Sequence, residues 1–259
     1  MSYRRFSDCS VSEKLLDTMF LLLLSVGYLF AMVLLYTTIS PLDGKPGLST
    51  DDIRIKYYGS RSGTRLENAL NGIMKDYRSK EEHATIIKWI YAGATKEQFG
   101  KKIAPIITKT CGKCHGPESA PVPDITTYEK MMTMVTMDTG ESLINLVRVS
   151  HIHLFGLSMI FYLLGRMFLL TELPVWLKRV MVVIPFVAIF LDIGSWWFTH
   201  YKNVFAYSVF GGGALMGMSF AFQFTITIYQ MWFYRPGVAS DAYKGPNRRS
   251  ERSAGRSRR

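Results

Sequence analysis

The sequence predicts an all-α membrane protein with four transmembrane helices and a small helical domain inserted between the first and the second. Two features of the 259 residues carry this prediction. Long apolar runs lie near both ends, each of them about as long as the roughly 20 residues that a helix needs to cross a bilayer. Residues 40–145 between them are polar, and they contain Pro-Gly turns and short stretches of helical periodicity.

The first apolar run covers residues 15–39 and follows a polar segment, residues 1–14. A cleaved signal peptide has a shorter apolar core and small residues at a cleavage site, and neither is evident here. We therefore expect an uncleaved signal anchor, with residues 1–14 on the cytoplasmic side.

The insert, residues 40–145, is expected to be a helical domain. Thr50-Asp51-Asp52 are typical of a helix start. The periodicity predicts helices over the following ranges: about 50–58, 65–77, 80–91, 101–110 and 127–137.

The C-terminal part, residues 146–234, is expected to form a three-helix transmembrane bundle with spans over about 151–170, 180–198 and 204–233. Basic residues concentrate in the link 171–179 and in the tail 235–259, which favours a cytoplasmic position for both. Both termini would then be cytoplasmic and the insert periplasmic. The tail is polar and is expected to be disordered. Topology accounts for its arginines and for much of the net charge of +11, so we expect no specific nucleic-acid binding.

Within the insert, Cys111-Gly112-Lys113-Cys114-His115 has the spacing of a covalent haem c attachment motif. Cys111 and Cys114 are predicted to form the two thioether bonds, and His115 to be the proximal iron ligand. The alternatives are a zinc site, which would need a second Cys/His pair, and a thioredoxin-like redox site, which would need a βαβ pattern. The only other cysteine, Cys9, lies beyond a transmembrane span. The carbonyl of Pro123 is expected to hold the His115 ring.

The sequence offers two groups of residues as candidates for the sixth ligand of the iron. The first is a methionine cluster about 20 residues after the motif, which would give a high potential, although methionines at helical spacing are also typical of a core. The second is a histidine that reaches up from the membrane, and an open coordination site is a third alternative. The candidates are Met131, Met134 and Met137, with Met132 beside them, and His151 or His153.

His151, His153 and His200 lie at the predicted periplasmic ends of two spans. They are candidate ligands for one haem b or for a metal ion such as copper or zinc, or they are simply interfacial side chains. Residues at i and i+2 of a helix point about 200° apart, so only one of His151 and His153 can face the bundle.

Asp192 lies inside the third span, where an ionisable side chain is costly enough to suggest a function. Asp192, Trp196 and His200 recur every four residues and predict a stripe for proton transfer during quinol oxidation. The alternative is a structural hydrogen bond to Ser219 or Gln223. Gly213 and Gly217 predict a small-residue face for close helix packing.

These residues give the chain a resemblance to membrane-anchored bacterial c-type cytochromes. In the insert, the resemblance rests on residues 111–115 and on Pro123-Asp124-Ile125. The segments 150–156 and 192–197 look like those of a family of bacterial membrane cytochromes. The resemblance implies one haem c, a periplasmic haem domain and four spans in the inner membrane.

We therefore expect an electron carrier or a subunit of a larger redox complex rather than a stand-alone enzyme. Its donor would be a quinol or a partner oxidoreductase, and its acceptor another redox protein of a respiratory or similar chain. One alternative is a quinol-oxidising cytochrome with an additional haem b or metal at the membrane histidines. The other is a haem-based sensor or assembly subunit whose iron is open to a ligand.

Overall fold

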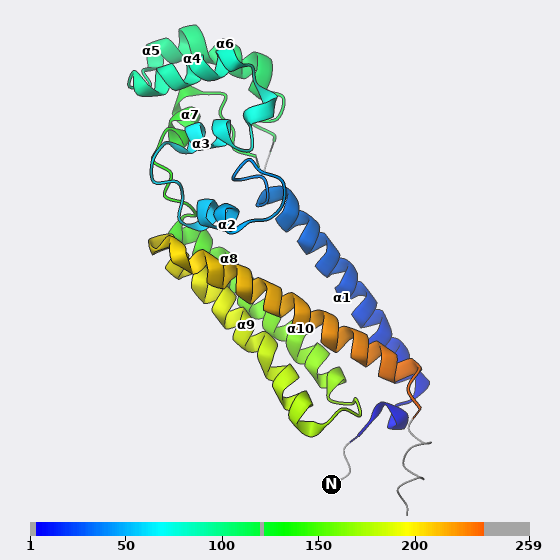
Figure 1. Cartoon of the computed structure of the whole chain (residues 1–259). Coiled ribbons are helices and arrows are strands. Elements are labelled where there is room, and N and C mark those ends of the chain that lie inside the picture. The colour runs from blue at the N-terminus through cyan, green and yellow to red at the C-terminus, as the bar shows by residue number, and fades with distance from the viewer. Residues whose placement is uncertain (1–3, 120–121, 236–259) are drawn as a thin grey trace, which may run out of the picture.

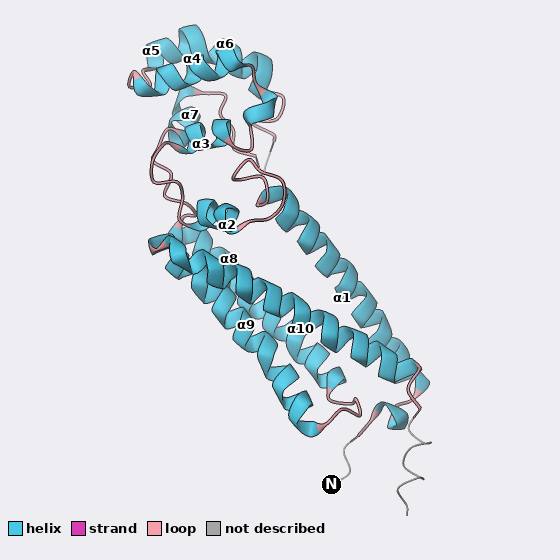
Figure 2. Cartoon of the chain, in the orientation of Figure 1, coloured by secondary structure: helices cyan, strands magenta, loops and turns pink. Residues whose placement is uncertain are grey.

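The computed structural model describes residues 4–119 and 122–235, and in this part of the chain the fold is all-α (Figures 1 and 2). Four helices are long and apolar enough to cross a membrane: α1 (Val11–Thr38), α8 (Leu143–Phe168), α9 (Val175–Tyr201) and α10 (Ala206–Trp232). The predicted fold class is therefore confirmed, including the helical insert between the first and second spans. The predicted disorder of the tail concerns residues that, from 236 onward, lie outside the described part.

Helices α8, α9 and α10 pack as a bundle, and α1 joins it along only part of its length. Leu21 of α1 is fully buried and Tyr28 stacks on Phe220 of α10, with ring centroids 4.9 Å apart. Beyond Tyr28, side chains on every side of α1 are exposed, for example Phe30 and Leu34. Figure 1 shows the same arrangement: α1 and α10 meet at the end where the N-terminus lies, which we call the terminal end, and the insert covers the opposite end, the insert end.

The spans begin and end at different residues from those predicted. Helix α8 begins at Leu143, eight residues before His151, because the hydroxyl of Ser142 accepts a hydrogen bond from Asn145 N and caps the helix. Helix α9 begins directly after Pro174 and continues to Tyr201. Hydropathy marks the part of a helix that is apolar, whereas caps decide where it begins. As a result, α8 runs without a break through the predicted domain boundary at residues 145–146.

The insert contains short helices stacked above the bundle (Figure 1). They are α2 (Thr50–Tyr57), α3 (Arg65–Asn71), α4 (Lys80–Tyr91), α5 (Lys96–Gln98), α6 (Ala104–Ile106) and α7 (Tyr128–Met134), with one-turn 3₁₀ or π segments between some of them. Their first turns carry a repeated sequence signal, in which a serine or threonine cap is followed three residues later by an acidic residue. This capping box satisfies two free N–H groups at once. It occurs at Ser49–Asp52, Thr64–Glu67 and Ser79–Glu82.

The predicted helix 65–77 is wrong in its second half, because α3 ends at Asn71 and only a 3₁₀ turn, Lys75–Tyr77, follows. The break falls at Gly72. A Cβ atom at this position would lie 2.7 Å from the carbonyl oxygen of Leu42, so the chain needs glycine where it passes the loop that leaves α1.

The predicted helix 101–110 is instead part of a longer run from Lys96 to Cys111 that includes two π-helical segments, Phe99–Ile103 and Ile107–Cys111. Pro105 lies between them and has no N–H to donate to a carbonyl one turn earlier. The second π segment closes with Gly112 N donating to Ile107 O at 2.7 Å. The Cys111–His115 motif therefore begins inside a widened helical turn, a feature often found at functional sites.

The insert is attached to the bundle through α2. The ring of Tyr57, which is 9% exposed, stacks on Trp196 of α9 with centroids 5.6 Å apart and an interplanar angle of 11°. The Tyr57 carbonyl lies 3.3 Å from Nδ1 of His200, and Arg61 donates to the His200 carbonyl at 2.9 Å. No motif marks Tyr57 in the sequence, so this contact was not predicted.

Helices α9 and α10 are in tight contact at Gly212. A Cβ atom on Gly212 would lie 3.0 Å from three atoms of Asp192. Gly213 has open space around its Cβ position, and Gly217 faces Tyr28 of α1. The small-residue prediction therefore holds for Gly217, where a Cβ atom would lie 2.7 Å from the Tyr28 hydroxyl of α1, and does not hold for Gly213.

Candidate functional site

The Cys111–His115 motif forms a single tight turn at the end of the long helix of the insert. The amides of Cys114 and His115 both donate to the carbonyl oxygen of Cys111, at 3.1 and 2.9 Å. Both thiols are free, with Cys111 half-buried against the insert core and Cys114 exposed. Burial raises the pKa of the Cys111 thiol. A reactive or metal-binding thiolate needs the opposite shift, so the environment suits a protonated thiol.

The ring of His115 is held by the backbone of the loop that follows the motif. Nδ1 of His115 lies 2.8 Å from the carbonyl oxygen of Pro123. A carbonyl can only accept a hydrogen bond, so Nδ1 carries a proton, and in the neutral ring the lone pair is on Nε2. This is the hydrogen bond expected from the sequence, and it prepares the tautomer that binds a metal through Nε2. A second contact, Ile125 N to His115 O at 3.3 Å, ties the loop back onto the motif.

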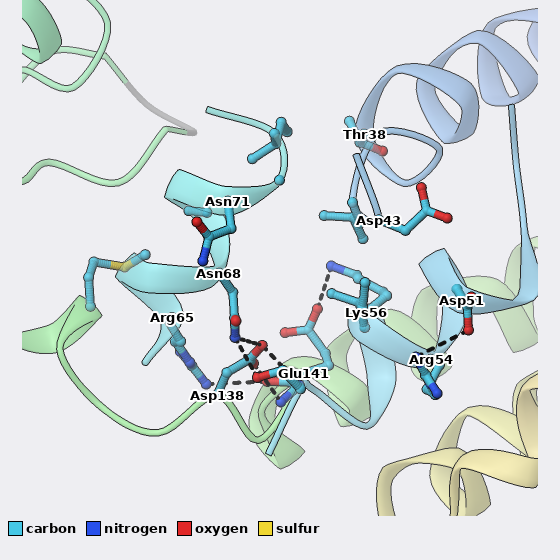
Figure 3. A pocket seen from close by; sticks show the side chains of 18 of the residues that line it. Thr38, Asp43, Asp51, Arg54, Lys56, Arg65, Asn68, Asn71, Asp138 and Glu141 are labelled. Carbon is cyan, nitrogen blue, oxygen red and sulfur yellow. Dashed lines mark hydrogen bonds and ion pairs between the residues drawn. The ribbon is translucent and has the colours of Figure 1, made fainter. Parts of the chain in front are cut away.

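A hollow of about 830 Å³ lies between the insert and the insert end of α1 (Figure 3). Its lining comes from the end of α1, from α2 and α3, and from the residues just before α8, and Pro123 and Met134 border it as well. Its volume is in the range of small-molecule and cofactor sites. The hollow is not lined by Cys111, Cys114 or His115. Pro123, whose carbonyl oxygen contacts the His115 ring, connects the motif to the hollow.

Several of the charged groups around the hollow are paired. Lys56 forms an ion pair with Glu141 at 2.6 Å, and Asp138 accepts a hydrogen bond from Asn68 at 2.8 Å (Figure 3). Burial would raise the pKa of Glu141, but the hydrogen bond and the charge of Lys56 outweigh it, so the pKa is lowered. Arg65 differs from these residues, because its guanidinium donates to the carbonyl of Gly140 at 3.2 Å and forms no ion pair with a described carboxylate.

The candidate methionine ligands are separated by the structure. Met131 is fully buried in the core of the insert, beside Ile103 and Ile107. Met137 is 62% exposed and lies in an isolated antiparallel bridge with Thr64. Met134 is half-buried and borders the hollow. Of the methionines named from the sequence, Met134 is therefore the one placed at a site with room for a ligand.

The three membrane histidines have different contacts. The His153 ring packs edge-on against Trp196, with ring centroids 5.2 Å apart. Its Nδ1 atom lies 2.9 Å from the carbonyl oxygen of Val149. His151 instead packs against Phe155 of its own helix. His200 contacts the Tyr57 carbonyl. Within residues 4–119 and 122–235, no three His, Cys, Asp or Glu side chains are grouped so that they could hold a metal ion.

Asp192 is 8% exposed and lies where α9 and α10 touch. Its hydrogen-bond partner is Nε1 of Trp196 on the same helix, at 3.3 Å. The predicted structural partners lie elsewhere: Gln223 donates to Met181 O at 2.8 Å, and Ser219 makes no side-chain hydrogen bond to Asp192 in the described residues. Burial raises the pKa of the Tyr57 phenol, and the nearby Asp192 raises it further. The insert therefore places a neutral phenol close to the Asp192 carboxyl group.

Comparison with known proteins identifies the C-terminal part of the chain as similar to a transmembrane helical domain. Residues 127–237 match a family model described as a transmembrane helical domain, which covers α7 to α10 and less than half of the chain. Together with the four candidate spans, this match defines a multi-pass membrane protein. No curated protein and no solved structure matched the chain.

Proposed function

We propose that this protein is a membrane-bound c-type cytochrome that transfers electrons at the periplasmic face of a bacterial inner membrane. Cys111 and Cys114 would hold haem c through thioether bonds, and His115 would bind its iron. The bound haem supplies a one-electron redox couple, and the rest of the chain positions it against the membrane.

The observation that carries the proposal is the hydrogen bond between His115 and Pro123. It holds the imidazole in a loop directly after two free thiols, and in the neutral ring it leaves the lone pair on Nε2. The nearby hollow supports the proposal further, because it offers space beside Pro123 and Met134.

Met134 is our candidate for the sixth ligand, since it borders the hollow whereas Met131 is enclosed in the core. A thioether ligand would favour the reduced iron and raise the potential. The attachment of α2 to Trp196 would keep the insert at the membrane surface. A quinol or a membrane-bound oxidoreductase could then donate electrons there, and a periplasmic redox protein could accept them.

The test is expression in bacteria with working haem-ligation machinery, followed by a pyridine haemochrome spectrum of the purified protein. We expect one haem c per chain, lost or strongly altered in Cys111→Ser, Cys114→Ser and His115→Met. The matched control is Cys9→Ser, which removes the third cysteine and should leave the spectrum unchanged. A colourless wild-type protein, or tags in residues 40–119 that face the cytosol, would contradict the proposal.

A second candidate function, quinol oxidation by this chain itself, is favoured by the setting of Asp192. This buried carboxyl lies beside Trp196, which in turn stacks on Tyr57 of the insert. Asp192 would take up a proton as quinol is oxidised. The measurement is quinol-dependent haem reduction in wild type and in Asp192→Asn; equal rates would remove Asp192 from the reaction. An additional b-type band in the haemochrome spectrum would extend this candidate to a second haem at the membrane histidines.

A further inference from the structure

A proline inside α9 leaves one carbonyl without its usual helical donor. Pro185 has no N–H, so the carbonyl of Met181, four residues earlier, lacks an intrahelical partner. In its place, Nε2 of Gln223 on α10 donates to Met181 O at 2.8 Å. A side chain from the neighbouring helix therefore replaces the missing backbone bond in the interior of the bundle.

This bond fixes the orientation of the Gln223 amide. A carbonyl accepts but does not donate, so the NH₂ group must face Met181 and the amide oxygen must face away. That oxygen, Oε1, has no hydrogen-bond partner among the residues that the structure describes, and neither has the hydroxyl of Thr227 one turn further along α10. Both side chains are 0% exposed. Two unpaired polar atoms in an apolar bundle are costly, because no lipid or bulk water can satisfy them.

The third helix leaves room beside the amide oxygen of Gln223. Gly165 of α8 is buried, and a Cβ atom on it would lie 4.0 Å from Gln223 Oε1 and 3.7 Å from Cγ1 of Val182. These are ordinary contact distances, so a methyl group would occupy this space without a clash. Glycine keeps it open at the junction of α8, α9 and α10.

The chemistry of the two atoms defines the ligand. The amide oxygen accepts a hydrogen bond, and the hydroxyl can both donate and accept. A metal cation would need several oxygen ligands and usually a carboxylate. Water is small and neutral and can be held by two to four polar partners.

We propose that Gln223 and Thr227 bind a buried water molecule in the space left by Gly165. This site is independent of the haem and of the proposed function.

The test is magnetisation transfer from water to the side-chain NH₂ group of Gln223, measured by solid-state NMR on the full chain in lipid bilayers. We expect transfer in the wild type and its loss to background in Gly165→Ala, whose methyl group fills the space. Thr227→Val, which removes the hydroxyl at similar volume, should reduce it at least several-fold.

Gly156→Ala is the matched control. It lies on the same helix with nothing within 4 Å of its Cβ position, and it should leave the transfer unchanged. Absence of transfer in the wild type would overturn the proposal, and so would full transfer in Gly165→Ala. Because Gly165→Ala meets no atom closer than 3.7 Å, it keeps the test decisive if Thr227→Val does not fold.

Discussion

The contact between Gly212 and Asp192 gives a sharp prediction about helix packing in the bundle. A methyl group on Gly212 would lie 3.0 Å from the backbone N, the Cα and the Cβ of Asp192. None of these atoms belongs to the end of a flexible side chain, so relief requires α9 and α10 to separate. Overpacking of this kind costs about 1–3 kcal/mol.

The neighbouring glycines isolate this cost. Gly211 and Gly213 are on the same helix and have nothing within 4 Å of their Cβ positions. Each alanine substitution gains about 0.5–1 kcal/mol in helix propensity, and this gain is common to all three variants. We therefore expect Gly212→Ala to be less stable than Gly211→Ala or Gly213→Ala by about 1–3 kcal/mol, which is the overpacking cost alone.

The assay is reversible unfolding of the purified chain in detergent or bicelles, with the three variants compared under the same conditions. Equal stabilities for the three variants would refute the register of α9 against α10. So would a larger loss in Gly213→Ala, because that result would favour the face predicted from the sequence.

Three further predictions concern the insert. Met134→Leu is expected to change the visible spectrum of the reduced haem and lower its potential, whereas Met131→Leu should mainly affect stability; a changed spectrum in Met131→Leu alone would reverse the assignment. Lys130 and Thr126 hydrogen-bond Asp124 and lower its pKa to about 2. The stability that this carboxylate contributes is therefore present above its ordinary pKa of 3.8 and is lost as the pH falls towards 2. In Lys130→Met, an NMR titration should find the pKa of Asp124 raised towards 3.8, and an unchanged value would contradict this cause. Tyr57→Ala removes a buried ring and should cost about 3–5 kcal/mol, with Tyr57→Phe as the mild control. Distances between spin labels on the insert and the bundle should broaden only in the alanine variant, and equal distributions would show that Tyr57 does not anchor the insert.

The features that the sequence predicted well depend on one-dimensional signals. The four spans follow from apolar length, and helix α4 follows from its periodicity. The hydrogen bond from His115 to Pro123 could be anticipated because the two residues belong to one short loop. These are all relations between residues close in the chain.

The features that were missed depend on pairs far apart in the chain. The Gly212–Asp192 contact and the Gln223–Met181 bond both require the register of α9 against α10, which hydropathy does not contain. Pro185 was the available signal for the second, since an internal proline implies a carbonyl in need of a donor. Its partner could not be named until the helices were placed. Met134 was likewise separated from Met131 only by the burial of each side chain.

The junction between the insert and the bundle bears on how the proposed electron transfer would work. Gly59 after α2 and Gly140 before α8 both have positive φ, at 81° and 74°. A Cβ on Gly140 would lie 2.4 Å from the Tyr57 carbonyl oxygen, so the two backbones touch where glycine alone fits. The ion pair between Lys56 and Glu141 lies beside this contact, and α8 continues from there into the bundle as one helix. An insert held by two chain segments and a stacked Tyr57 is fixed rather than swinging. In the proposed function, redox partners would have to come to the haem edge, and the membrane surface beneath α2 would limit the directions of their approach.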